Sequence, residues 1–262
     1  MKIKKGNVEA EILPKGAYLY SFKIDGKELI LRGNLERVTR GGMAVLIPFA
    51  NRIKGGEYIF EGKRYVLPKN NEGNAIHGLV LDKEFEVLEV QNDGVSLKHE
   101  LEHEGYPTKL ACVLIYKLFR NGFRVKISVK NVGNNRGPLT VGLHPYFIVS
   151  EDWNIEVKNN VKRCVTFNKI PTGELVKTKI EHGEYDDCFF VNDTILLKSS
   201  YSIVKIVRRN MPFIQLYTGV RGALAIEPMS GAPDAYHNGL GLRIVEPNEE
   251  VNYSFSAKFL KF

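Results

Sequence analysis

The sequence predicts an all-β fold, most simply one large antiparallel β-sandwich. Short runs of alternating apolar and polar residues recur along the chain, as expected for strands with one buried face. The 24 glycines and 11 prolines interrupt these runs at close intervals. No window of twelve or more residues shows a convincing apolar period of 3.6, so long helices are not expected.

The clearest strand is "FRVKISVKN", in which the apolar residues alternate with polar ones from Phe123 to Lys130. The preceding run "LACVLIYKLF" is apolar on both faces, and Asn121-Gly122 predicts a two-residue hairpin turn with positive φ at both positions. A second hairpin is expected around Gly62. The other expected strands are Val8–Leu13, Ala17–Ile24, Phe85–Val90, Val95–Leu101, Ser202–Val207, Phe213–Thr218 and Val251–Ala257.

The bulk composition favours a single domain over residues 1–262, without linker or internal repeat. No segment approaches the roughly 18 consecutive apolar residues of a membrane helix, and the first residues lack the apolar core of a signal peptide. Three cysteines far apart in the chain predict reduced thiols and a cytoplasmic location. The net charge of +7 is spread along the chain, so neither a nucleic-acid partner nor a membrane partner is expected.

The segment "KHELEHEG" contains a literal HExxH sequence, from His99 to His103. That motif holds zinc only on a helix, which brings residues four apart onto one face. Here the apolar residues alternate with period two, and strand positions four apart are separated by about 13 Å. We therefore interpret this segment as a polar strand, and a zinc peptidase remains a remote alternative.

Three stretches place polar residues in apolar or turn surroundings. Asn51 and Arg52 follow an apolar run closed by a proline, and the arginine fork suits vicinal hydroxyls or a carboxylate; a surface ion pair is the alternative. His77 lies in "NAIHGLV", where a hydrogen-bonded structural histidine is the ordinary interpretation. Asp186 and Asp187 lead into an apolar strand, as in a turn or cap.

Glu227 and His144 share an unusual design. Each closes an apolar run, and each precedes a proline that favours an extended backbone. A carboxylate at the end of a buried strand has a raised pKa, which suits a general base near neutrality. Two titratable groups in different environments are typical of an acid and base pair.

With these residues assembled, the chain resembles the aldose 1-epimerase (galactose mutarotase) family. The matching stretches follow the family's order and approximate spacing from about residue 48 to 246. They are "NRIKGGEYIFEGKRYVLPKNN", "NAIHG", "HEGYP", "HPYF", "YDDCF" and "IEPMSGAPDAYHNG".

The resemblance implies the galactose mutarotase-like supersandwich, a carbohydrate cleft, a small-molecule sugar substrate, and neither metal ion nor cofactor. It implies His144 as the acid toward the ring oxygen and Glu227 as the base toward the anomeric hydroxyl. It also implies Asn51, Arg52, His77 and one acidic residue as sugar ligands, with Asp186 favoured over Asp187. Phe49 or Tyr146 would stack on the sugar.

The expected activity is that of an aldose 1-epimerase, an isomerase that interconverts the α and β anomers of free hexoses. A hexose-6-phosphate 1-epimerase is an alternative, for which Arg208 and Arg209 supply positive charge. A non-catalytic carbohydrate-binding module is another. A glycosidase is less favoured because it needs two carboxylates beside the glycosidic bond. Both a monomer and a homodimer are compatible with the sequence.

Overall fold

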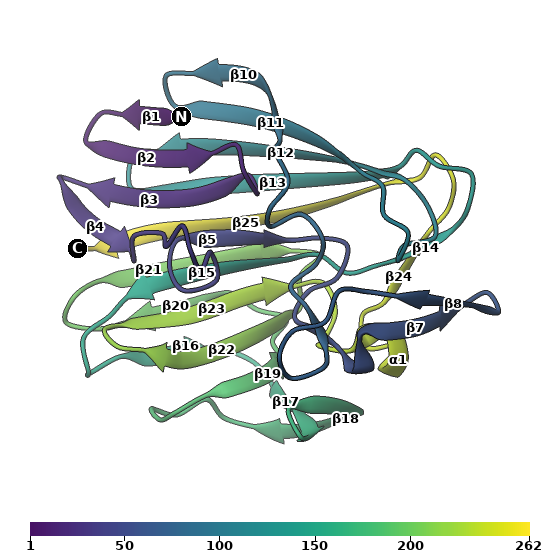
Figure 1. Ribbon diagram of the computed structural model, residues 1–262. Coiled ribbons are helices and arrows are strands. Elements are labelled where there is room, and N and C mark those ends of the chain that lie inside the picture. The colour runs from purple at the N-terminus through teal and green to yellow at the C-terminus, as the bar shows by residue number, and fades with distance from the viewer.

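Two large antiparallel sheets make up most of the protein (Figure 1), which confirms the predicted all-β sandwich. The computed structural model describes residues 1–262. The first sheet contains, in spatial order, β1 (Lys2–Lys5), β2 (Val8–Leu13), β3 (Tyr18–Ile24), β4 (Lys27–Ile30), β15 (Gly142–Ile148), β23 (Ala223–Met229), β22 (Phe213–Val220), β19 (Asp186–Phe190), β17 (Val161–Phe167) and β18 (Ile170–Thr178), with β5 (Met43–Leu46) pairing β15 and β3.

The second sheet has eight strands. They are, in spatial order, β10 (Glu86–Gln91), β11 (Gly94–Leu101), β12 (Leu110–Phe119), β13 (Gly122–Asn131), β25 (Glu250–Lys261), β21 (Ile203–Arg209), β20 (Ile195–Lys198) and β16 (Asn154–Val157). Three two-stranded sheets pair β14 (Gly137–Leu139) with β24 (Arg243–Val245), β6 (Arg52–Ile53) with β9 (Ala75–Ile76), and β7 (Glu57–Phe60) with β8 (Lys63–Val66). The helical segments are η1 (Lys54–Gly56) and α1 (Ala235–Asn238), and neither is long and apolar enough to cross a membrane.

The two large sheets bury one shared apolar core. Phe22 of the first sheet packs against Phe123 and Phe259 of the second, with ring centroids 4.8 and 5.4 Å apart. These rings belong to a core cluster of 60 buried residues drawn from both sheets. Burial of this apolar surface is the main force that holds the sandwich together.

The alternation in β13 is confirmed. Phe123 and Val125 are buried in the core, whereas Arg124 and Lys126 are exposed. The neighbouring strand β12 differs from the prediction, because it is buried on one face only and leaves 43% of Ile115 exposed.

The predicted turn at Asn121-Gly122 is wrong by one residue. Phe119 pairs with Gly122, so Arg120 and Asn121 form the two-residue loop, and neither has a positive φ. Asn121 instead binds the backbone of Phe259, donating from Nδ2 to its carbonyl at 2.7 Å. Gly122 is required by close packing, since a Cβ atom there would lie 2.1 Å from the carbonyl oxygen of Ala257.

The hairpin between β7 and β8 does follow the expected turn chemistry. Glu61 and Gly62 form its loop with φ values of 50° and 76°. A turn with positive φ at both central residues has a backbone twist that matches the right-handed twist of the flanking strands.

These two glycines give a test of the packing argument. Gly122→Ala should lower the free energy of unfolding by about 1–3 kcal/mol, because the backbone of β25 must move to admit the methyl group. Gly62→Ala meets no atom within 4 Å and should cost only about 1 kcal/mol of backbone strain. Denaturant unfolding measures both, and an equal or smaller loss for Gly122→Ala would contradict the assignment.

Candidate functional site

A small cavity of about 260 Å³ lies against the first sheet, on the face turned away from the core. In β15, Leu143 and Phe147 point into the large core, so the alternate residues His144 and Tyr146 point to the opposite face. Loops then close over this face. The cavity is lined by Thr39, Arg40, Asn51, Arg52, Asn70, Glu72, Ile76, His77, His144, Tyr146, Asp186, Tyr217 and Glu227.

His144 and Glu227 meet across two neighbouring strands. The pairing of Gly142 with Met229 and of Tyr146 with Ala225 places His144 opposite Glu227. The His144 Nε2 and Glu227 Oε1 atoms are 3.3 Å apart. The prediction that each residue ends its strand is wrong: β15 and β23 continue through the prolines that follow them.

Both side chains are almost completely buried, with 5% of His144 and 2% of Glu227 exposed. Burial lowers the pKa of His144 to about 3. Burial also raises the pKa of Glu227, as does the nearby charge of Asp186, while Arg52 opposes the rise. The contact has the geometry of an ion pair, but burial penalises charge on both groups and favours the form in which His144 is neutral and Glu227 holds the proton.

Several buried polar atoms of this region have no hydrogen-bond partner within the protein. They are His77 Nδ1, His144 Nδ1, Gln215 Oε1 and Glu227 Oε2, four of the seven such atoms in the chain. Buried polar atoms are normally paired, because an unpaired one costs about 1–3 kcal/mol. Their concentration around one cavity indicates a place prepared for a polar ligand.

A network of charged side chains surrounds the pair. Arg52 Nη2 lies 3.7 Å from Asp186 Oδ2, and its Nε donates to Glu72 Oε2 at 3.4 Å. Gln215 Nε2 donates to Asp186 Oδ1 at 2.8 Å. Lys169 Nζ lies 3.5 Å from Glu72 Oε1. These contacts hold a guanidinium and a carboxylate at the cavity wall.

The structure distinguishes the two neighbouring aspartates. Asp186 lines the cavity, whereas Asp187 binds Arg163, accepting from Nη2 at 2.6 Å. Successive residues of β19 point to opposite faces, so only one of the two can reach the cavity.

Asn51 and His77 enter the cavity from strained backbone positions. Their φ values are 57° and 65°, and the His77 amide donates to the Asn51 carbonyl at 2.9 Å. They flank the small β6–β9 pair, in which Arg52 lies opposite Ile76. Positive φ at residues other than glycine costs energy and is frequent at functional sites. Burial also lowers the pKa of His77 well below its usual value, with a smaller effect from His144.

Sequence reasoning missed Gln215, which lies beside the cavity, and these lining residues: Thr39, Arg40, Asn70, Glu72, Ile76 and Tyr217. Arg40 donates to the hydroxyl of Tyr217, and its Cζ lies 5.1 Å from that ring's centroid. Gln215 lies opposite Glu227 in the sheet. A buried glutamine inside the apolar run "FIQLY" was the available signal, whereas nothing in the sequence around Arg40 indicated its position.

Of the two aromatic candidates, Tyr146 lines the cavity, whereas Phe49 is buried and packs edge-on against Tyr236 at 6.1 Å. The positive charge of Arg208 and Arg209 lies elsewhere: Arg208 donates to the carbonyls of Val191 and Asp193, and neither arginine lines the cavity.

The HExxH segment is confirmed as a strand as far as Leu101, where β11 ends. His99 Nδ1 contacts the Glu84 carbonyl at 2.9 Å, and His103 Nδ1 accepts from the Gly105 amide at 2.9 Å. Each histidine thus binds the backbone of a different segment.

Comparison with solved structures places the same fold in several other proteins. A putative aldose 1-epimerase from Escherichia coli K12 superposes with a TM-score of 0.87 at 19% identity, over 100% of this chain and 98% of that one. A galactose mutarotase-like protein from Clostridium acetobutylicum superposes with a TM-score of 0.88 at 19% identity, over 100% and 95%.

The sequence comparisons extend this likeness. Uncharacterized protein YihR of Escherichia coli (strain K12) is 27% identical, over 98% of this chain and 92% of its own length. Galactose mutarotase of Mus musculus is 32% identical, over 87% and 81%. The sequence model of the family described as Aldose 1-epimerase matches residues 1–258, and the chain belongs to the aldose 1-epimerase family.

Proposed function

We propose that this protein is an aldose 1-epimerase that interconverts the α and β anomers of free hexoses. The contact between His144 and Glu227 inside a cavity rich in unpartnered polar atoms carries the proposal. The cavity of about 260 Å³ is smaller than the roughly 300–1,000 Å³ of drug-sized ligand sites, which suits a single sugar ring.

The spacing of the pair fits the reaction. Opening the ring removes the proton from O1 and adds one to O5, and both oxygens are bonded to the same carbon. The acid and the base must therefore lie side by side, as His144 and Glu227 do at 3.3 Å. The 3.3 Å spacing differs from that of a glycosidase, in which two carboxylates lie roughly 5–9.5 Å apart on either side of the bond that they cleave.

The proposed reaction starts once the proton has moved from Glu227 to His144 across their 3.3 Å contact. The Glu227 carboxylate takes the O1 proton, the O1 electron pair forms the C1=O1 bond, and the C1–O5 bond breaks. O5 takes the proton of His144. Rotation about C1–C2 turns the other face of the aldehyde toward O5, and the reverse transfers close the ring as the other anomer. Asn51, Arg52, His77 and Asp186 are the proposed sugar ligands.

A 6-phosphorylated hexose is a second candidate substrate, favoured by Arg40. This guanidinium lines the cavity and has no carboxylate within ion-pair distance. It is therefore a positive charge without a carboxylate partner beside the proposed sugar site, held by its hydrogen bond to Tyr217. A carbohydrate-binding module without turnover would use the same cavity, but it needs no acid and base in contact. Cytoplasmic location and a monomeric or homodimeric state are parts of the same proposal.

The activity is tested by exchange NMR between the anomers of glucose and galactose. The protein should accelerate exchange over buffer, and Glu227→Gln should lower kcat/KM by about 10²–10⁴-fold because the base is lost. Glu104→Gln, an exposed carboxylate remote from the cavity, is the matched control. Saturable sugar binding without faster exchange would identify a binding module instead.

The buried carboxylate should also lower stability at high pH. A carboxyl group whose pKa is higher in the folded than in the unfolded state stabilises the fold at low pH. This contribution to the free energy of unfolding is lost as the pH rises through the raised pKa of Glu227. The Tm of Glu227→Gln should therefore exceed that of the wild type by an amount that grows with pH. A thermal unfolding series from pH 5 to 9 measures this, and a constant difference would contradict burial of an ionisable Glu227.

Arg40 gives a test between free and phosphorylated hexoses. If the 6-phosphate is the substrate, Arg40→Gln should lower kcat/KM for glucose 6-phosphate by roughly ten- to a hundredfold and change that for glucose much less. Equal effects on both sugars, or a wild-type preference for glucose, would leave free hexoses as the substrate.

A further inference from the structure

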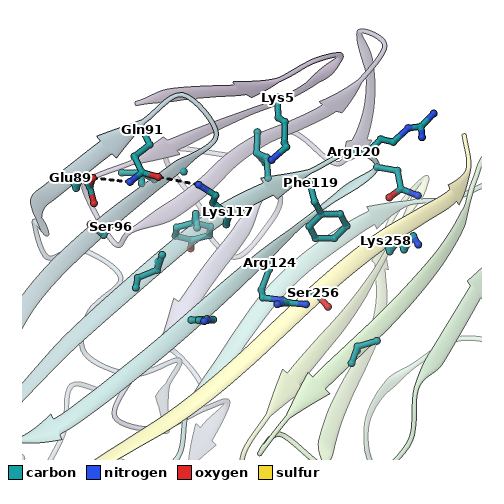
Figure 2. A pocket seen from close by; sticks show the side chains of 18 of the residues that line it. Lys5, Glu89, Gln91, Ser96, Lys117, Phe119, Arg120, Arg124, Ser256 and Lys258 are labelled. Atoms are coloured by element: carbon teal, nitrogen blue, oxygen red, sulfur yellow. Dashed lines mark hydrogen bonds between the residues drawn. The ribbon is translucent and has the colours of Figure 1, made fainter.

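A second, larger concavity lies on the outer face of the eight-stranded sheet, whereas the sugar cavity lies against the first sheet. Its volume is about 920 Å³, and its lining residues come from β10, β11, β12, β13, β25 and β21, with Lys5 from β1. Figure 2 shows Phe119, Arg124, Ser256 and Lys258 on the strands of this face. We name this concavity the basic groove.

The basic groove holds seven cationic side chains and one carboxylate. The carboxylate, Glu89, accepts a hydrogen bond from Gln91. Lys5 and Lys117 pair with Asp93 at 2.7 and 2.6 Å. The remaining five cations are exposed and form neither an ion pair nor a hydrogen bond within the protein: Arg120, Arg124, Lys126, Lys205 and Lys258.

The strand register brings some of these cations directly opposite one another. Lys117 pairs with Arg124 across β12 and β13, and Lys205 pairs with Lys258 across β21 and β25. Like charges directly opposite in a sheet destabilise the fold. A bound anion would relieve this repulsion, so the face is complementary to a partner with several negative charges.

The uncharged lining residues indicate what kind of anion fits. Hydroxyl and amide groups lie among the cations, at Ser96, Ser256 and Asn121. Aromatic groups are scarce: Tyr116 is 1% exposed, and Phe119 is the other aromatic residue of the lining. Single-stranded nucleic acid normally stacks its bases on successive aromatic rings, which this face does not offer. Cations beside hydroxyl and amide groups suit carboxylates and hydroxyls that alternate along a sugar chain.

We propose that the basic groove binds a strand of an acidic polysaccharide, with its uronate carboxylates on the five free cations. The hydroxyl and amide groups of the lining bind the sugar hydroxyls between those carboxylates. This surface is separate from the sugar cavity, so its occupancy does not depend on the proposed epimerase activity.

The test measures binding of alginate, a polyuronate, to the whole protein by titration calorimetry at several salt concentrations. The wild type should bind alginate with an affinity that falls as salt rises, and should not bind neutral dextran. Lys205→Gln/Lys258→Gln should weaken alginate binding by roughly three- to tenfold through the loss of two exposed charges.

The matched control is Lys162→Gln/Lys177→Gln. These lysines also face each other across two strands, β17 and β18, but they lie outside the basic groove. The control should bind alginate like the wild type, and unfolding midpoints show that both double variants are folded. An equal loss in both variants, no alginate binding by the wild type at low salt, or equally tight binding of single-stranded DNA with the same number of charges would each overturn the proposal.

Discussion

The antiparallel register between β15 and β23 is the constraint on which the site depends. It places His144 opposite Glu227, and the next strand places Gln215 opposite Glu227 in turn. One row of residues across the sheet therefore supplies the proposed acid and base, His144 and Glu227, and a neighbouring amide. Because side chains alternate between faces, the same register that directs these groups outward sends Leu143 and Ile226 into the core. Packing of the sandwich thus fixes the relative position of His144 and Glu227 without the help of a loop.

The site is stable only because the rest of the molecule compensates for it. Burying a titratable pair, leaving several polar atoms without partners, and holding Asn51 and His77 at positive φ all oppose folding. The shared core of 60 buried residues provides the compensating free energy. A rigid sheet also prevents His144 and Glu227 from relaxing into better-solvated positions, which keeps them available to a ligand.

Much of this architecture could be predicted from the sequence, because alternation reports directly which face of a strand is buried. The chemical pair could also be identified, since a carboxylate and a histidine within apolar runs are unusual. Their position within the strands could not. A proline suggests a strand end, yet Pro145 and Pro228 sit inside strands, paired with Met43 and Ile214. Arg40 could not be predicted either, because a loop distant in sequence brings it to the cavity through contacts that leave no local periodicity.

The row of residues across the sheet has a consequence for how such proteins can change length during evolution. A single-residue insertion or deletion within β15 or β23 would turn every following side chain to the other face, exchanging core residues with cavity residues. Insertions in the connecting segments leave the register intact. Loops, and with them the overall length, can therefore change while the positions of His144 and Glu227 remain opposite each other. A length difference between two members of this family consequently says little about whether their chemistry is the same.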